Sequence, residues 1–329
     1  MRSGKSPPLP PNRRLRRTVA RLLLTVPTLS LTGCQGDDFV PGTYCYDYTA
    51  TVTIDTTPDG GGIITGLDCM AICRTQKPET TACREGSTGV TYSDGGSQVR
   101  TYVACDYPSR TCTYVDGRQP EGLLAARVKA PSALGALFAE MAWLESASVP
   151  AFLRLADELK AHGAPEALIR AARRSAGDEV RHTRVMEALA RRHGAPMPEV
   201  EIAPFAQRSL EAMVLENTRE GCVREMYGAV VAGWQARTAQ DAQVRAELAR
   251  IAEDELRHAE LAWAVDAWAA ERLTPAEYQR VREARLEAFQ ELERTVAQEE
   301  PEAVLVQQAG LPSRNSALRL LRGLQVLVA

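Results

Sequence analysis

The chain has 329 residues, of which 45% are hydrophobic and 25% are charged. This composition is ordinary for a folded chain of about two domains, and it excludes a protein that is disordered throughout. The formal net charge of −3 provides no overall basic field, so nucleic acid is excluded as an expected partner.

The N-terminal segment, residues 1–33, has the layout of an export signal. Five arginines between Arg13 and Arg21 precede the apolar run Leu22 to Leu31, which is too short to span a bilayer. The run ends in Leu31-Thr32-Gly33-Cys34, which resembles the lipobox of bacterial lipoproteins. That resemblance implies cleavage before Cys34 and a lipid on its side chain, which would anchor the protein to a membrane of the cell envelope, on the periplasmic or outer-membrane face. A plain secretory signal and an arginine-rich disordered start are the alternatives.

Residues 34–125 are predicted to form a small domain of strands and loops that disulfides hold together. Runs of β-branched and aromatic residues alternate there with glycine-rich turn clusters. With Cys34 set aside as the lipidation site, six of the remaining cysteines lie in this region, which is an even number. We favour disulfides over zinc because the region contains no histidine and no Cys-x-x-Cys pair. The sequence leaves the pairing open. The cysteines concerned are Cys45, Cys69, Cys73, Cys83, Cys105 and Cys112.

Residues 126–329 are rich in Ala, Leu, Glu and Arg, which is a helical composition. Short links between successive helices predict two antiparallel hairpins, and a longer, proline-containing link joins them. The tail from Pro312 predicts one more amphipathic helix, which we expect to cap the bundle rather than bind a membrane surface. The predicted helices cover about 132–161, 165–193, 204–238, a stretch that reaches about 272, and a fifth that begins with a capping box at 274–277.

Two nearly identical pentapeptides lie in the second and fourth predicted helices, Asp178-Glu179-Val180-Arg181-His182 and Asp254-Glu255-Leu256-Arg257-His258. Each contains Glu-x-x-His, and a helix places residues i and i+3 on one face, about 5–6 Å apart. Carboxylate and imidazole groups are suitable ligands for Fe, Mn or Zn. Two such pairs therefore predict a metal site that the two helices share.

Glu145 and Glu220 are the carboxylates predicted to join this site from the other two helices. Glu145 lies 37 residues before His182, and Glu220 lies 38 residues before His258. Because similar hairpins return the chain to the same height, each glutamate should face the Glu-x-x-His pair of its own hairpin.

Several other carboxylates are alternatives or supporting groups. Glu216 lies one helical turn before Glu220 and could replace it, whereas Glu140 or Glu225 could add a further ligand or line the approach to the site. Asp178 and Asp254 are candidates to accept the second ring N–H of the histidines, because ligating imidazoles usually donate it to an acceptor. Pairing of these aspartates with the neighbouring arginines is the alternative.

The ordered set of residues between about 132 and 272 resembles the ferritin-like superfamily, including its rubrerythrin and bacterioferritin type of di-iron protein. The resemblance implies a mainly α fold: a ferritin-like four-helix bundle with extra C-terminal helices, preceded by the small disulfide-rich β/loop domain. It implies two Fe ions, or Mn or a mixed pair, with Glu179 and Glu255 as bridges and the other carboxylates as terminal ligands. The implied ligands are Glu145, Glu179, His182, Glu220, Glu255 and His258.

The functional expectation is an exported, lipid-anchored di-iron oxidase, peroxidase or oxygenase, in which no catalytic side chain besides the metal ligands is assigned. Iron binding with ferroxidase turnover is the second interpretation. A non-catalytic envelope interaction protein with a vestigial metal site is the third. The expected partners are metal ions, dioxygen or peroxide, and the membrane through the lipid. A homodimer is compatible with these features, whereas the N-terminal domain would obstruct a closed storage shell.

Overall fold

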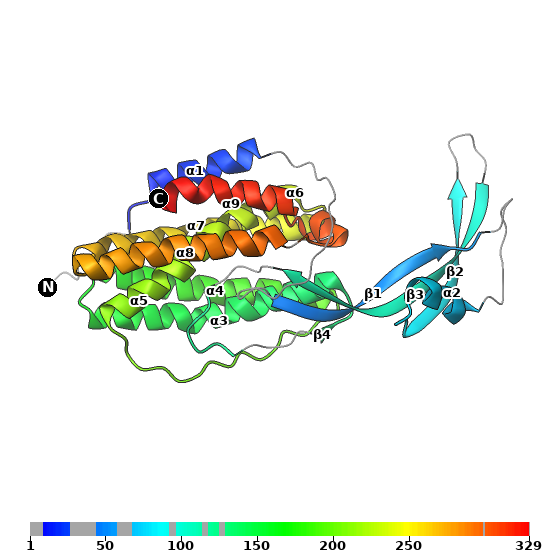
Figure 1. Cartoon of the computed structure of the whole chain (residues 1–329), viewed down its shortest axis with the longest axis horizontal. Helices are drawn as coiled ribbons and strands as arrows, with labels where there is room; N and C mark the ends of the chain where they lie inside the picture. Colours follow the sequence, from blue (N-terminus) through cyan, green and yellow to red (C-terminus); the bar gives the residue numbers. More distant parts are fainter. Residues whose placement is uncertain are drawn as a thin grey trace.

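The computed structural model describes residues 9–26, 44–57, 68–91, 97–113, 118–124, 129–298 and 300–328. In these ranges the protein is mainly helical, and a narrow sheet projects from one end of a helical bundle (Figure 1). The helices are α1 (Arg13–Thr25), α2 (Cys69–Gln76), α3 (Ala133–Ala161), α4 (Glu166–Arg192), α5 (Leu210–Glu216), the π-helix η1 (Asn217–Glu225), α6 (Met226–Thr238), α7 (Ala242–Ala270), α8 (Pro275–Gln298), the π-helix η2 (Leu305–Ala309) and α9 (Arg314–Val328). The strands are β1 (Tyr44–Asp55), β2 (Ala82–Thr91), β3 (Ser97–Thr113) and β4 (Lys129–Ala130).

The bundle contains two helical hairpins, which pack against each other through α4 and α7. The first hairpin is α3 with α4, and the second is the continuous series α5, η1 and α6 with α7. The residues between α4 and α5 run along the outside of the bundle and connect the hairpins (Figure 1). Phe138, Trp143, Leu144 and Met226 are buried between these helices. Helix α8 packs on the second hairpin, and α9 packs on α8.

The helix boundaries agree with local capping chemistry. The Ser132 hydroxyl accepts a hydrogen bond from the Gly135 N–H and begins α3, which continues through Pro150 without interruption. The predicted capping box at the start of α8 is present, because the Thr274 N–H donates to the Glu277 carboxylate and the Glu277 N–H donates back to the Thr274 hydroxyl. The predicted C-terminal helix is α9, whose Leu320, Leu321 and Leu324 are buried against the bundle.

The third helix begins at Leu210, later than the predicted start near residue 204. Its N-cap is Ser209, whose hydroxyl accepts a hydrogen bond from the Ala212 N–H. The residues before it are held outside any helix by a side chain, since the Arg208 guanidinium donates to both carboxylate oxygens of Glu158 on α3. Pro204 therefore belongs to the connection between the hairpins, and Ser209 marks the start of the helix.

The sheet has the strand order β2-β3-β1-β4, in which β1 and β2 flank β3 in antiparallel fashion and β4 adds a short parallel edge. Its buried apolar core is small and includes Cys73, Val103 and Cys105. Two cysteine pairs at disulfide distance, Cys69–Cys83 and Cys73–Cys105, join α2 to strands β2 and β3. A sheet with so little apolar mass needs such covalent links for stability.

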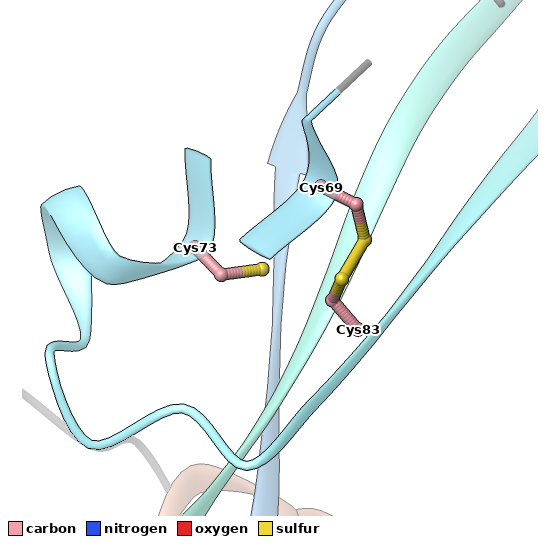
Figure 2. A group of neighbouring side chains, drawn as sticks. All are labelled: Cys69, Cys73 and Cys83. Carbon is pink, nitrogen blue, oxygen red and sulfur yellow. A yellow bond between two sulfur atoms is a disulfide. The ribbon is translucent and has the colours of Figure 1, made fainter. Parts of the chain in front are cut away.

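The sulfur atoms of Cys69, Cys73 and Cys83 lie close together, but the pairing accounts for their proximity (Figure 2). Sulfur in a disulfide is not a thiolate ligand, so this cluster does not favour zinc. The side chains of Cys45 and Cys112 lie outside the described residues, but the backbone register places the two residues opposite each other on β1 and β3. Paired cysteines are typical of an oxidising, extracytoplasmic compartment.

Part of the predicted export segment forms helix α1, which packs against α6 and α9. Leu15 and Val19 are buried in this contact, and the Arg16 guanidinium pairs with Glu253 and Glu260 of α7. Cys34 lies outside the described residues. Among the helices that the structure describes, none offers an apolar stretch long enough to cross a bilayer.

Candidate metal centre

The two pentapeptides of the sequence face each other where α4 packs against α7. Together with one residue of α3 they bring five of the six predicted ligands into one buried cluster: Glu145, Glu179, His182, Glu255 and His258. Ligand atoms of four of them, all except His258, lie within 4.8 Å of one another. The His258 ring is 0% exposed, and its centroid lies 5.9 Å from that of His182.

Glu179 and Glu255 each present one oxygen to each imidazole. Oε2 of Glu179 lies 3.6 Å from Nδ1 of His182, and its Oε1 lies 3.0 Å from Nδ1 of His258. Glu255 repeats this arrangement, with Oε1 3.2 Å from Nδ1 of His182 and Oε2 3.5 Å from Nδ1 of His258. Glu145 adds an oxygen 3.5 Å from Nδ1 of His182. The cluster is therefore organised around two imidazole nitrogens that share two carboxylates.

Four ligand atoms in this cluster are buried without a hydrogen-bond partner: Glu179 Oε2, His182 Nδ1, Glu255 Oε1 and His258 Nδ1. Their mutual distances are short, but their orientations do not satisfy hydrogen-bond geometry. Burying polar atoms unpaired is costly, and buried carboxylates require compensation by positive charge. Because these atoms come from two helices and face a common space, the arrangement fits a metal ion.

The opposite edge of each imidazole is held by an aspartate from the other hairpin. Nε2 of His182 lies 3.1 Å from Oδ2 of Asp254, and Nε2 of His258 lies 3.4 Å from Oδ2 of Asp178. If each Nε2–H donates to its aspartate, the lone pair of each Nδ1 is directed at the cluster. The aspartates also accept hydrogen bonds from two arginines of the pentapeptides, Arg181 and Arg257.

The charge of the cluster changes the pKa values of its members. Burial alone would lower the pKa of His182 and of His258, but the surrounding carboxylates more than reverse this effect and raise both pKa values well above the usual range. Burial and the neighbouring Glu179 raise the pKa of Glu145. Without a metal, protons on the imidazoles therefore supply positive charge that a bound cation would otherwise provide, and metal binding would release them.

The structure does not bring Glu220 into this cluster. Its carboxylate accepts a hydrogen bond from the Gln119 N–H at 3.2 Å and pairs with Arg224 at 3.5 Å. Glu225 takes the buried position on this helix instead and pairs with Arg118 at 3.1 Å. Burial raises the pKa of Glu225 to about 6, although Arg118 and His258 oppose the shift. Its partner Arg118 lies 4.8 Å from the centre of the Phe152 ring, which itself lies 5.0 Å from the His258 ring.

The π-helix η1 explains why residue spacing predicts Glu220 as a ligand although the structure places its carboxylate outside the cluster. Its i→i+5 hydrogen bonds accommodate more residues per turn than an α-helix, so the residues after its start rotate away from α-helical positions. The helix packs closely there: a Cβ atom at Gly221 would lie 2.5 Å from the Cβ of Ala262 on α7. Neither helix propensity nor charge spacing in the sequence predicts this change of pitch.

Arg118 is the functional candidate that sequence reasoning missed. It lies in the connection between the sheet and the bundle, far from any motif, yet its side chain is 1% exposed. A buried arginine is detectable only from the fold, because most arginines lie at the surface.

Comparisons with protein-family models, with curated proteins and with solved structures gave no match for this chain. The chemistry of the centre follows from the side chains themselves.

Proposed function

We propose that this protein is an oxidoreductase built around a ferritin-like di-metal centre, with two iron ions held between its helical hairpins. The observation that supports this most is the set of four buried, unpartnered ligand atoms that face one space. Manganese, or a mixed iron and manganese pair, would suit the same oxygen and nitrogen donors.

The placement of the carboxylates indicates which residues would hold each ion. One ion would bind to Nδ1 of His182 and the other to Nδ1 of His258. Glu179 and Glu255 would bridge them, because each carboxylate has one oxygen beside each imidazole. Glu145 would be a terminal ligand on the His182 side.

A redox-active metal pair would supply the electrons that reduce dioxygen or peroxide. The residues of the chain keep this space dry and fix its protons. The Phe152 ring is fully buried and lies 5.0 Å from the His258 ring, so it excludes water from that side. Asp254 and Asp178 accept the Nε2 protons and thereby leave each Nδ1 free to bind metal.

We also propose that the centre operates in the cell envelope, on a chain anchored by lipid at Cys34. The two cysteine pairs at disulfide distance and the lipobox-like sequence support this location. Intact mass spectrometry of protein extracted from membranes should show the loss of residues 1–33 and an added lipid. A chain that keeps Met1 and carries no lipid would contradict this part of the proposal.

Metal content tests the central proposal. Protein loaded anaerobically with Fe²⁺ and then dialysed should retain about two irons per chain, as expected for a two-metal site. Glu179→Gln should lose both, because this carboxylate serves both imidazoles. Glu187→Gln on the same helix is the matched control and should retain the wild-type content, since Glu187 pairs with Arg191 at the surface. Wild-type protein without retained iron or manganese would overturn the proposal.

A further inference from the structure

Arg118 carries a positive charge into the side of the metal centre. It belongs to residues 118–124, which we call the connector because they lead from the sheet to the bundle. The guanidinium donates to Glu225 at 3.1 Å and to Asn217 at 3.2 Å, and it lies 4.8 Å from the centre of the Phe152 ring. The Arg118 carbonyl accepts a hydrogen bond from Ser148 of α3 at 3.0 Å. Because both its guanidinium and its backbone carbonyl are hydrogen-bonded, Arg118 holds its positive charge at a fixed position.

The connector is itself held along the bundle, which keeps this arginine in place. The Gln119 N–H donates to Glu220, and Leu123 forms a bridge with Ile202 in the segment between α4 and α5. The Glu121 carboxylate pairs with Arg154 and Arg208. The position of Arg118 therefore depends on backbone and side-chain contacts that do not involve the metal ligands.

Glu145 of α3 and Glu225 of η1 are both buried, each on the first helical segment of its hairpin, but they differ in their partners. Glu145 directs an oxygen at Nδ1 of His182. Both oxygens of Glu225 accept from Arg118 instead, Oε1 from Nε at 3.1 Å and Oε2 from Nη2 at 3.5 Å. The half of the centre at His182 thus has its own terminal carboxylate, whereas the half at His258 has a carboxylate already engaged by a cation.

We propose that Arg118 is a positioning residue that withholds Glu225 from the ion at His258, so that the two halves of the centre fill unequally. This inference rests on the proposed di-metal function. The first ion would be held by His182, Glu145 and the two shared carboxylates. The second ion would lack a terminal carboxylate unless Glu225 left Arg118, and the positive charge of Arg118 would oppose this ion as well. The fold thus couples occupancy of the second half to the position of the connector.

Titration with Co²⁺, which resists oxidation by air, tests the inference through binding constants rather than activity. Wild-type protein should show one tight and one weak site. Arg118→Gln should tighten the weak site by about tenfold or more, since removing a charged neighbour of a buried site has effects of this order. The tight site should keep its affinity. Arg118→Lys keeps the charge but lacks the planar guanidinium that engages both oxygens of Glu225, so it should tighten the weak site less than Arg118→Gln does. It replaces Arg118→Gln in the test if that variant does not fold.

Two further variants complete the design. Adding Glu225→Gln to Arg118→Gln should abolish the gain, because the released ligand is then missing. Arg285→Gln is the matched control, since Arg285 of α8 is also a buried arginine that pairs with a buried carboxylate, Asp266 of α7, but it takes no part in holding the connector, so both sites should be unchanged. Two sites whose affinities do not respond to Arg118→Gln would overturn the inference and leave the di-metal centre intact. Absence of bound Co²⁺ in every variant would overturn the centre and the inference together.

Discussion

Each histidine of the centre depends on an aspartate from the opposite hairpin. This exchange makes the two pentapeptides mutually dependent: Asp254 orients His182, and Asp178 orients His258. Burial would raise the pKa of Asp254, but its interactions with His182 and Arg257 lower it to about 2, so this aspartate remains an anion and an acceptor at neutral pH. The sequence proposed these aspartates as supporting groups, but only the packing of α4 on α7 decides that the pairs cross between hairpins.

Asp254→Asn should therefore weaken metal binding without removing a ligand. The amide is a poorer acceptor, and the His182 ring loses the partner that directs Nδ1 at the cluster. We expect a loss of roughly 10–100-fold in affinity, as for other groups that orient metal ligands. Equilibrium competition with a chelator measures it. Asp157→Asn on the surface of α3 is the control, and equal affinities in the two variants would contradict the role of Asp254.

At the level of elements, most helix boundaries could be predicted because they depend on local chemistry. The serine at the start of α3 and the Thr274 capping box satisfy backbone groups within one turn, so the information lies in neighbouring residues. The π-helix η1 could not be predicted in this way. Its pitch depends on packing against α7 and on Arg118, which are distant in sequence. Glu225, at the end of this segment, is the glutamate that is buried and paired with Arg118.

Glu220 and Glu225 should therefore behave differently when substituted. Glu220→Gln should leave the number of bound metal ions unchanged, because its carboxylate contacts Gln119 and Arg224 outside the cluster. Glu225→Gln should weaken binding of the second ion further, because the positive charge of Arg118 is then no longer balanced by a carboxylate. Metal content after dialysis against decreasing metal concentration distinguishes the two. A larger loss in Glu220→Gln than in Glu225→Gln would restore the assignment expected from residue spacing.

At the level of the whole molecule, two differently stabilised parts meet at the connector. The bundle relies on buried apolar side chains, whereas the sheet relies on covalent links between α2 and its strands. The composition of the chain predicted this division. It did not predict that residues 13–25 pack on the bundle as α1, because the same arginine-rich, apolar pattern suits an export signal and an amphipathic helix. Export with cleavage would remove α1, and the mass of the envelope-bound protein decides between the two fates.

Peptide mapping under non-reducing conditions should find three disulfides, including Cys45–Cys112. The backbone register places these two residues opposite each other, and the other four cysteines of the domain already form pairs. Cys222 should be recovered as a free thiol, because it is buried in η1 and burial raises its pKa well above the usual range of a thiol. Labelling with a thiol reagent before and after denaturation is the control. A link between Cys222 and any cysteine of the sheet would contradict the two-part organisation.

The most direct measurement is a structure of the iron-loaded protein with anomalous scattering recorded at the iron edge. The proposed di-metal centre predicts two peaks about 3.5–4 Å apart between α4 and α7. One peak should lie at bonding distance from Nδ1 of His182 and the other at bonding distance from Nδ1 of His258, and the carboxylates of Glu179 and Glu255 should each contact both ions. Iron bound only at surface carboxylates, or imidazole Nδ1 atoms without metal in crystals grown with excess Fe²⁺, would contradict it.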